Sequence, residues 1–312
     1  MNDKPVSKVL VLDESPEHLR SIKKFCDEND LVALKVRRGS VMSVLRTNID
    51  LGAILLSEVY GGSPEEAARI AAEIHETRPE LPVIMRRESS ANLEGLAEPV
   101  RRAVCAAYIA NDMAALRNVI GERIFCLMYP NALLRGIAEI TESVLTSQFP
   151  GVRVSMETPY IVHDRIIFGE LFSLMELESS WCRGYMMLQT EEDPLLVLAG
   201  HPPRTAFRTV NDLLGEVTNL IWGAFKNRYL GDPAAMSGSQ VPLLVNHKHK
   251  YISFGTSNPQ LCFRFTLADA TGTRTATLYA RFVFNLSWSP QDFKEIPQAF
   301  AGLVESGELQ LF

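Results

Sequence analysis

The sequence has few cysteines, no long hydrophobic run and no excess of positive charge. Its 312 residues include five cysteines, scattered and odd in number, as is typical of buried thiols in a reducing cytoplasm and not of disulfides or a zinc cluster. No apolar run approaches the ~20 residues of a membrane span, and the N-terminal MNDKPVSK lacks a secretory apolar core. Lys and Arg number 31 against 37 Asp and Glu, a net charge of −6, which disfavours nucleic-acid binding. We therefore expect a cytoplasmic protein with no nucleic-acid and no membrane partner.

What the sequence does contain is the composition of a globular protein of about two domains, with 46% hydrophobic residues. In residues 1–127, apolar runs alternate with amphipathic stretches. Strands are expected at 8–12, 31–36, 53–56, 81–85 and 106–110. Helices are expected after Pro16 and at about 40–48, 64–77, 92–104 and 113–128, with Ser63 as an N-cap. This order predicts a doubly wound α/β domain with five parallel strands, whose functional crevice lies beyond the carboxyl ends of the strands.

Residues 130–312 predict a second domain of the α+β class with a C-terminal extension. A helical pattern covers 131–149, and a second one covers 209–230. Strands are expected at 152–158, 166–177, 185–189, 242–245, 251–254, 261–267 and 275–284, and a short helix at 290–304. The strands at 166–177 and 185–189 are expected to pair in antiparallel fashion.

The first domain resembles a response-regulator receiver domain over about residues 1–125. The segments VLVLDES, AILLSEV, ETRPELPVIM and AAYIAND carry the resemblance. In that family an acidic pair after the first strand holds Mg²⁺, and Asp13 and Glu14 match this pair. Because two carboxylates alone rarely hold Mg²⁺ tightly, the alternative interpretation is a remnant or a charge at a helix N-terminus.

Three other positions depart from the receiver pattern. Ser57, Arg87 (or its neighbour Arg86) and Asn111 stand where the resemblance places the phosphoacceptor Asp, a Thr or Ser, and a Lys. A serine hydroxyl is a poor substitute for a carboxylate nucleophile, and loss of the Lys removes a charge that would hold the phosphoryl group. Glu58 is acidic but lies one residue on, so strand alternation points it to the other face. We therefore predict a degenerate pocket, a pseudo-receiver used for docking or dimerisation.

The most informative segment of the second half is TVNDLLGEVTNLIWGAFKNRYL, residues 209–230. Apolar residues recur there at helical spacing, whereas Asp212, Glu216 and Asn219 stand at i, i+4 and i+7 and share one face. A carboxamide can orient a water molecule, and a carboxylate can bind a cation on a partner. A solvated helix face is the alternative interpretation of this pattern.

This arrangement resembles the CheC/CheX family of response-regulator phosphatases, over about residues 130–288. The family signature is (Asp/Ser)-x3-Glu-x2-Asn followed by 22 residues and Pro. The three polar residues fit it, Pro242 follows after 22 intervening residues, and Gly215 and Gly223 fit the family's GE-x2-N-x3-G context.

The resemblance implies a phosphatase acting on a phosphorylated, CheY-like receiver domain. It implies that Asn219 positions the attacking water and that Glu216 pairs with a lysine of the receiver. Asp212 would orient or cap, although a first-turn acid favoured by the helix dipole is an alternative. No cofactor or metal of its own is implied, because the substrate receiver supplies Mg²⁺. A homodimer is also expected.

Two other functions stay open at this point. The chain could bind receivers without hydrolysing them, or it could be a response regulator whose CheX-like domain is the output. Weaker candidate sites are His247 and His249, which alternate on an expected strand without a third ligand, and Cys182 beside Arg183 as an activated thiol.

Overall fold

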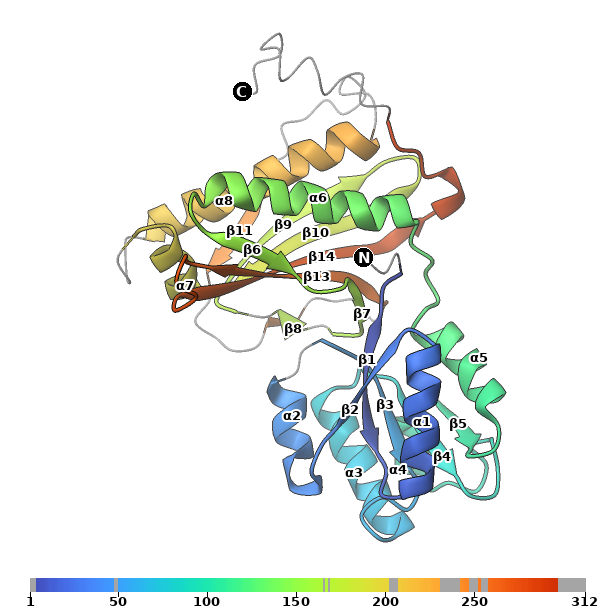
Figure 1. Cartoon of the computed structure of the whole chain (residues 1–312). Coiled ribbons are helices and arrows are strands. Elements are labelled where there is room, and N and C mark those ends of the chain that lie inside the picture. The colour runs from blue at the N-terminus through green and yellow to red at the C-terminus, as the bar shows by residue number, and fades with distance from the viewer. Residues whose placement is uncertain are drawn as a thin grey trace. The chain divides into compact units, whose positions relative to one another are not determined.

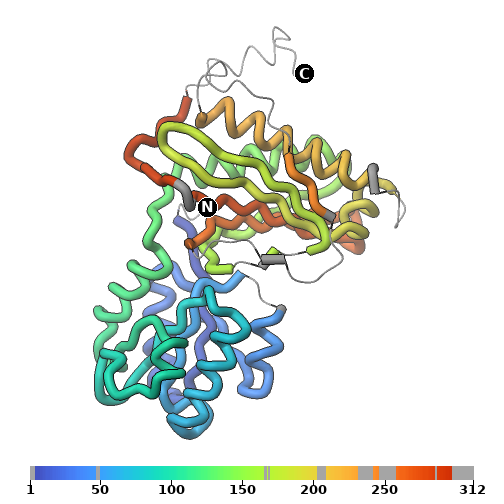
Figure 2. Tube along the Cα trace, turned by 180° about the vertical axis from the view of Figure 1, so that it is seen from behind, coloured from blue at the N-terminus to red at the C-terminus, as the bar shows by residue number. Residues whose placement is uncertain are grey.

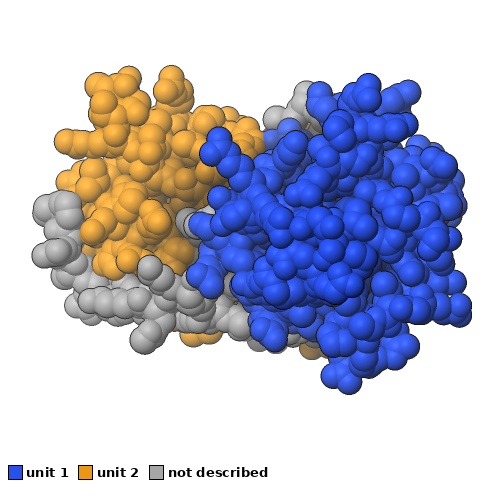
Figure 3. All heavy atoms as spheres, turned by 90° about the horizontal axis from the view of Figure 1, so that it is seen from below, with its two compact units in different colours: residues 1–128, 158–168, 251–262 blue, residues 129–157, 169–250, 263–312 orange. Residues whose placement is uncertain are grey.

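The computed structural model describes residues 4–47, 50–164, 166–167, 169–201, 207–230, 242–246, 252–253 and 258–296. The chain forms two compact units, coloured in Figure 3. Unit 1 comprises Met1–Met128, Thr158–Phe168 and Tyr251–Cys262, and unit 2 comprises Tyr129–Glu157, Gly169–Lys250 and Phe263–Phe312. Among the described residues, no helix is long and apolar enough to cross a membrane.

Unit 1 is built on the predicted five-stranded parallel sheet, with strand order β2-β1-β3-β4-β5 (Figure 1). Its strands are β1 Ser7–Leu12, β2 Leu31–Lys35, β3 Leu51–Ser57, β4 Val83–Arg87 and β5 Ala106–Ile109. All seven residues of β3 are buried, as expected for a central strand covered on both faces. The doubly wound α/β prediction for this part of the chain is confirmed.

The helices of this sheet largely follow the predicted pattern. They are α1 Pro16–Glu28, α2 Val41–Thr47, α3 Pro64–Thr77, α4 Glu98–Ala103 and α5 Met113–Arg123, with a 3₁₀ turn at Arg38–Ser40. The Ser63 hydroxyl accepts a hydrogen bond from the Glu66 amide at 3.3 Å, so the predicted N-cap is confirmed. The helix expected at 92–104 starts only at Glu98, because Gly95 has a φ of 77°, outside the helical region.

A segment from the second half of the sequence belongs to unit 1. It contains the short strand β7 (Tyr160–Val162), which was not predicted from the sequence. The Ile161 amide donates to the Val6 carbonyl at 2.8 Å, and the His163 amide donates to the Leu51 carbonyl at 3.1 Å. These bonds pair backbone groups at the amino ends of β1 and β3. Such groups are costly to bury unpaired.

The same segment supplies a carboxylate to a buried arginine. Arg78, at the end of α3, is 1% exposed and forms ion pairs with Glu80 and with Asp164, at 2.5 and 3.2 Å. Its guanidinium also donates to the Leu45 carbonyl at 3.0 Å. A buried charge needs such partners, because its desolvation is otherwise uncompensated. Residues 158–168 are therefore an integral part of unit 1.

The second sheet has strand order β11-β9-β10-β14-β13-β6. The strands in this order are β6 Arg153–Met156, β9 Leu171–Glu178, β10 Cys182–Thr190, β11 Leu243–Asn246, β13 Gln260–Ala268 and β14 Thr275–Trp288. The short strand β7 also pairs with β13. Two further short strands, β8 Ile166–Ile167 and β12 Ile252–Ser253, form a separate two-stranded sheet. The predicted antiparallel pair is the hairpin β9–β10, which runs side by side in Figure 2. The single strand expected at 166–177 is interrupted at Gly169, where φ is 78° and a Cβ would lie 2.1 Å from the Thr190 carbonyl oxygen.

Two long helices of unit 2 pack together over its sheet: α6 (Asn131–Gln148) and α8 (Phe207–Phe225) (Figure 1). The described chain also holds α7 (Glu192–Leu198), which was not predicted, a π-helical turn at Lys226–Leu230 and a 3₁₀ turn at Pro290–Asp292. Only this short turn covers the described part of the helix expected at 290–304. Residues 297–304 lie outside the described residues.

Candidate functional site

Helix α8 presents the predicted polar residues on its solvent side. Asp212, Glu216 and Asn219 are all exposed. The opposite side is buried against the sheet and α6, through Val210, Leu214, Val217, Ile221 and Phe225, each at most 2% exposed. The apolar stripe therefore holds the helix in place, and one carboxamide and two carboxylates face solvent from a rigid support. We call α8 the signature helix.

A buried pair of hydroxyl groups anchors the signature helix beside Asn219. Thr218 Oγ1 donates to the Leu214 carbonyl at 2.6 Å and lies 2.6 Å from Ser173 Oγ on β9. Because the Thr218 proton is used within the helix, the Ser173 hydroxyl donates to Thr218. Both residues are fully buried, so this chain of bonds fixes how the helix is rotated and placed over β9.

Two further signature residues set the distance between the signature helix and the edge strand β11. A Cβ at Gly215 would lie 3.3 Å from Leu244 Cδ1, closer than ordinary van der Waals contact. Glycine therefore lets β11 pack closely under the helix. Pro242 is buried and leads directly into β11. The Gly and the distant Pro of the signature thus serve the packing that supports the polar face.

Removing the Thr218 hydroxyl should weaken the fold of unit 2. The Thr218→Val variant leaves the buried Ser173 hydroxyl without its acceptor, so we expect a loss of about 1–3 kcal/mol in the free energy of unfolding. Chemical denaturation measures it. Thr218→Ser keeps the hydroxyl and should lose less. An unchanged Thr218→Val variant, with a loss only in Thr218→Ser, would assign the stabilisation to the Thr methyl group instead.

In unit 1, the crevice predicted to be a degenerate receiver pocket is filled by an arginine. Arg86 is 5% exposed, and its Nε donates to Asp13 Oδ2 at 2.6 Å. Its Nη2 donates to Ser57 Oγ at 2.9 Å, and its Nη1 binds Glu88. Burial by itself lowers the pKa of Arg86, but the hydrogen bonds to Asp13 and Glu88 outweigh it and raise the pKa. The pocket therefore contains a permanent positive charge.

This arrangement does not fit a magnesium site. Asp13 Oδ1 also accepts from the Ser15 amide at 2.8 Å, so both oxygens of this carboxylate are engaged. Its predicted partner Glu14 is exposed. A divalent cation would have to displace a guanidinium that already neutralises Asp13. Among the described residues, no group of three or more His, Cys, Asp or Glu side chains is placed to hold a metal ion.

Arg87, the residue predicted at the pocket, lies elsewhere. Its Nε donates to Glu58 at 3.1 Å, and its Nη1 donates to two carbonyls of the following loop. The pairing of β3 with β4 explains the difference, because Ser57 lies opposite Arg86 and their side chains leave the sheet on the same side. Arg86, which the sequence offered as the second choice, is therefore the pocket residue. Asn111 is exposed in the turn after β5.

Two aromatic side chains beside this pocket were missed in the sequence. His18 on α1 and Tyr108 on β5 are buried, and His18 Nε2 lies 2.9 Å from the Tyr108 hydroxyl and 3.8 Å from Asp13 Oδ2. Burial lowers the pKa of His18, and the neighbouring Asp13 only partly offsets this. No local pattern identifies such a pair, because its members lie 90 residues apart.

Phosphoryl analogues should leave this pocket unchanged. We expect no Mg²⁺-dependent beryllofluoride binding and no modification by acetyl phosphate, because Arg86 neutralises Asp13 and Ser57 is no carboxylate. NMR chemical shifts of the full chain measure the first, and intact mass measures the second. A receiver domain with an intact acceptor Asp serves as the positive control. A beryllofluoride-dependent shift around Asp13 and Ser57 would overturn the assignment of a degenerate pocket.

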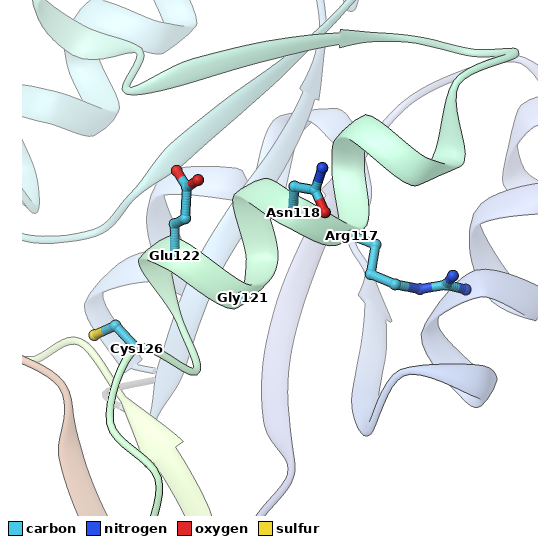
Figure 4. A pocket seen from close by; sticks show the side chains of 5 residues that line it. All are labelled: Arg117, Asn118, Gly121, Glu122 and Cys126. Carbon is cyan, nitrogen blue, oxygen red and sulfur yellow. The ribbon is translucent and has the colours of Figure 1, made fainter.

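The remaining candidate sites show no activated side chain among the described residues. A shallow, open depression on α5 is lined by Arg117, Asn118, Gly121, Glu122 and Cys126 (Figure 4). Cys126 is exposed, but desolvation by its surroundings still raises the pKa of its thiol, so this thiol is not activated. Burial likewise raises the pKa of Cys182 to about 12, as expected of a core cysteine. His247 and His249 lie outside the described residues.

Comparison with known proteins gives structural likenesses only. No protein-family model matches the chain, and no curated protein matches it significantly. Solved structures similar to the C-terminal part are CheX- and CheC-like chemotaxis proteins, and those similar to the N-terminal part are CheY-like receivers.

Three of these structures illustrate the sequence identity and coverage of the matches. Chemotaxis protein CheX from Vibrio vulnificus is 21% identical over 47% of this chain and 96% of its own, with a TM-score of 0.36. A CheY-like receiver domain protein from Methanospirillum hungatei JF-1 is 17% identical over 38% of this chain and 92% of its own, with a TM-score of 0.32. A CheX–CheY–BeF₃–Mg²⁺ complex from Borrelia burgdorferi is 14% identical over 48% of this chain and 97% of its own, with a TM-score of 0.33.

Proposed function

We propose that this protein is a protein-aspartate phosphatase that dephosphorylates a phosphorylated response regulator in a two-component or chemotaxis-type pathway. The observation that carries the proposal is the signature helix. Its acid and amide, Glu216 and Asn219, are exposed on one face while the other face is locked into the core of unit 2. The complete sequence signature, including Pro242, supports the same function.

The chemistry asked of this chain is positioning. The Asn219 carboxamide accepts a hydrogen bond from a water molecule and holds it in line with the phosphorus of the partner's phosphoaspartate. Attack by this water breaks the acyl phosphate P–O bond, which releases inorganic phosphate and restores the partner's carboxylate. Phosphoryl transfer depends mostly on such positioning and on electrostatic stabilisation. The Mg²⁺ of the reaction belongs to the substrate receiver.

Glu216 and Asp212 have different roles in this proposal. Glu216 lies close to Asn219 on the exposed face and binds a lysine of the receiver, which sets the register of docking. Asp212 lies one turn further from Asn219 and orients the docked partner without contacting the reacting atoms. In this proposal Asn219 therefore acts on the attacking water and Glu216 on the receiver's lysine. Asp212 acts only on binding.

The two alternative functions are less well supported. A receiver-binding scaffold would need Glu216 for docking but would not need the amide of Asn219. A phosphorylation-gated regulator would need a pocket that accepts a phosphoryl group, whereas Arg86 is bonded to Asp13 and Ser57 there. The first alternative is separated from our proposal by measuring turnover and binding on the same samples.

We include a homodimer in the proposal. The edge strand β11 exposes Leu243, of which 58% is accessible to solvent. An exposed sheet edge with an apolar side chain is a suitable surface for strand pairing between two copies. Sedimentation velocity across a concentration series tests the dimer, and a monomer at all concentrations would contradict it.

The decisive experiment is a single-turnover assay. Receiver domains from the same organism are phosphorylated with acetyl phosphate in Mg²⁺ and mixed with the full chain in excess. The proposal predicts that at least one of them loses phosphate faster than it does alone. If none does, and none binds when activated with beryllofluoride, the proposed function is wrong. Binding without accelerated hydrolysis would favour the scaffold.

A further inference from the structure

Four glycines lie inside the described α-helices: Gly121, Gly136, Gly215 and Gly223. Glycine disfavours a helix interior because it loses more backbone freedom on folding than any other residue. At each of these positions we therefore ask whether the packing of this chain requires glycine.

The packing of unit 2 explains two of them. A Cβ at Gly136 on α6 would lie 1.6 Å from the Tyr229 hydroxyl, which donates to the Ala132 carbonyl. Gly215 allows the close approach of Leu244 described above. A side chain at Gly136 would have to displace the Tyr229 side chain. One at Gly215 would need Leu244 to shift by a few tenths of an ångström.

Gly223 has no such reason. Among the described residues, no heavy atom other than those of its chain neighbours and the backbone of its own helix lies within 4 Å of the place where its Cβ would be. Its φ is not positive, so the backbone conformation suits any residue. The fold would therefore accept alanine here and gain helix propensity.

The position of Gly223 points to the partner instead. It follows Asn219 by four residues, so it lies one turn further along on the same face of the signature helix. Side chains of a helix lean toward its N-terminus and cover the preceding turn. Any side chain at 223 would thus cover the helix surface beside the Asn219 carboxamide. Glycine leaves that surface open to a partner.

We propose that Gly223 is a positioning residue, over which the backbone of the phosphorylated receiver passes when Asn219 reaches the phosphoaspartate. This inference rests on the proposed function and adds a contact to it. The acidic groups of the exposed face, Asp212 and Glu216, lie on the N-terminal side of Asn219. The receiver's cationic group therefore docks on that side, and uncharged main chain docks on the glycine side.

A graded series of substitutions tests this inference. Gly223→Ala should raise KM for the phosphorylated receiver about tenfold and Gly223→Leu about a hundredfold, as expected when extra atoms enter a close contact. In both variants kcat at saturation should change less than twofold, because Asn219 is intact. The melting temperature of Gly223→Ala should rise by about 1–3 °C, because helix propensity improves.

Gly121→Ala on α5 is the matched control, because Gly121 is also a helical glycine with no described atom, beyond its chain neighbours and its own helix backbone, within 4 Å of its Cβ position. It should raise the melting temperature similarly and leave KM unchanged. If the wild type is active and Gly223→Ala keeps the wild-type KM, the inference fails while the proposed function stands. If the wild type neither dephosphorylates nor binds any of the receiver domains tested, the proposed function is wrong. The inference about Gly223 is then wrong as well.

Discussion

Replacing Asn219 with alanine should slow the single-turnover dephosphorylation of a receiver domain about 100-fold or more, the usual loss for one positioned catalytic group. Affinity for the beryllofluoride-activated receiver should stay within about twofold, because the remaining docking surface is unchanged. Asn219 is exposed, so the free energy of unfolding should change by no more than about 0.5 kcal/mol. Undiminished hydrolysis by Asn219→Ala would contradict the proposal that Asn219 positions the attacking water.

Glu216→Ala provides the contrast on the same helix. We expect it to weaken receiver binding as well as turnover, because its proposed partner is a lysine of the substrate. Glu142→Ala is the matched control, since Glu142 is an exposed carboxylate on another helix of unit 2, α6. If all three variants keep wild-type activity, the exposed polar residues of α8 are a solvated helix face and no more.

Arg78→Ala should cause the largest loss of stability in unit 1, about 3–5 kcal/mol. The substitution leaves the carboxylates of Glu80 and Asp164, 5% and 0% exposed, without their shared cation. Chemical denaturation of the full chain measures the loss. Arg69→Ala is the matched control, because Arg69 also pairs with two carboxylates but is 61% exposed. Its loss should stay below about 1 kcal/mol.

A second variant keeps this prediction testable if Arg78→Ala does not fold. Asp164→Asn removes only one of the two anionic partners and retains an oxygen that can accept from the guanidinium, so its loss should be smaller, about 1–3 kcal/mol. If Asp164→Asn leaves stability unchanged, the segment 158–164 does not contribute through the charge of Asp164. Its contribution would then come from the backbone bonds of β7 alone.

Much of the fold and part of the site could be predicted from the sequence, because the signals are local. The N-cap at Ser63 depends on residues three positions apart, and the exposed face of the signature helix follows from helical periodicity. Glycines with positive φ were harder to place. Gly95 shortened one predicted helix and Gly169 divided one predicted strand, since a glycine in a sequence does not reveal which φ it will adopt.

The alternation of strands and helices and the line of acid and amide on α8 follow from the sequence alone, because repeating patterns within one element encode both. Two pairings depend on the folded chain: Arg86, and not Arg87, occupies the pocket of Asp13, and Asp164 neutralises Arg78. These pairs join residues far apart in the chain, and their formation depends on strand register and on burial. A buried charge selects its partner by geometry and desolvation, which no local sequence pattern records.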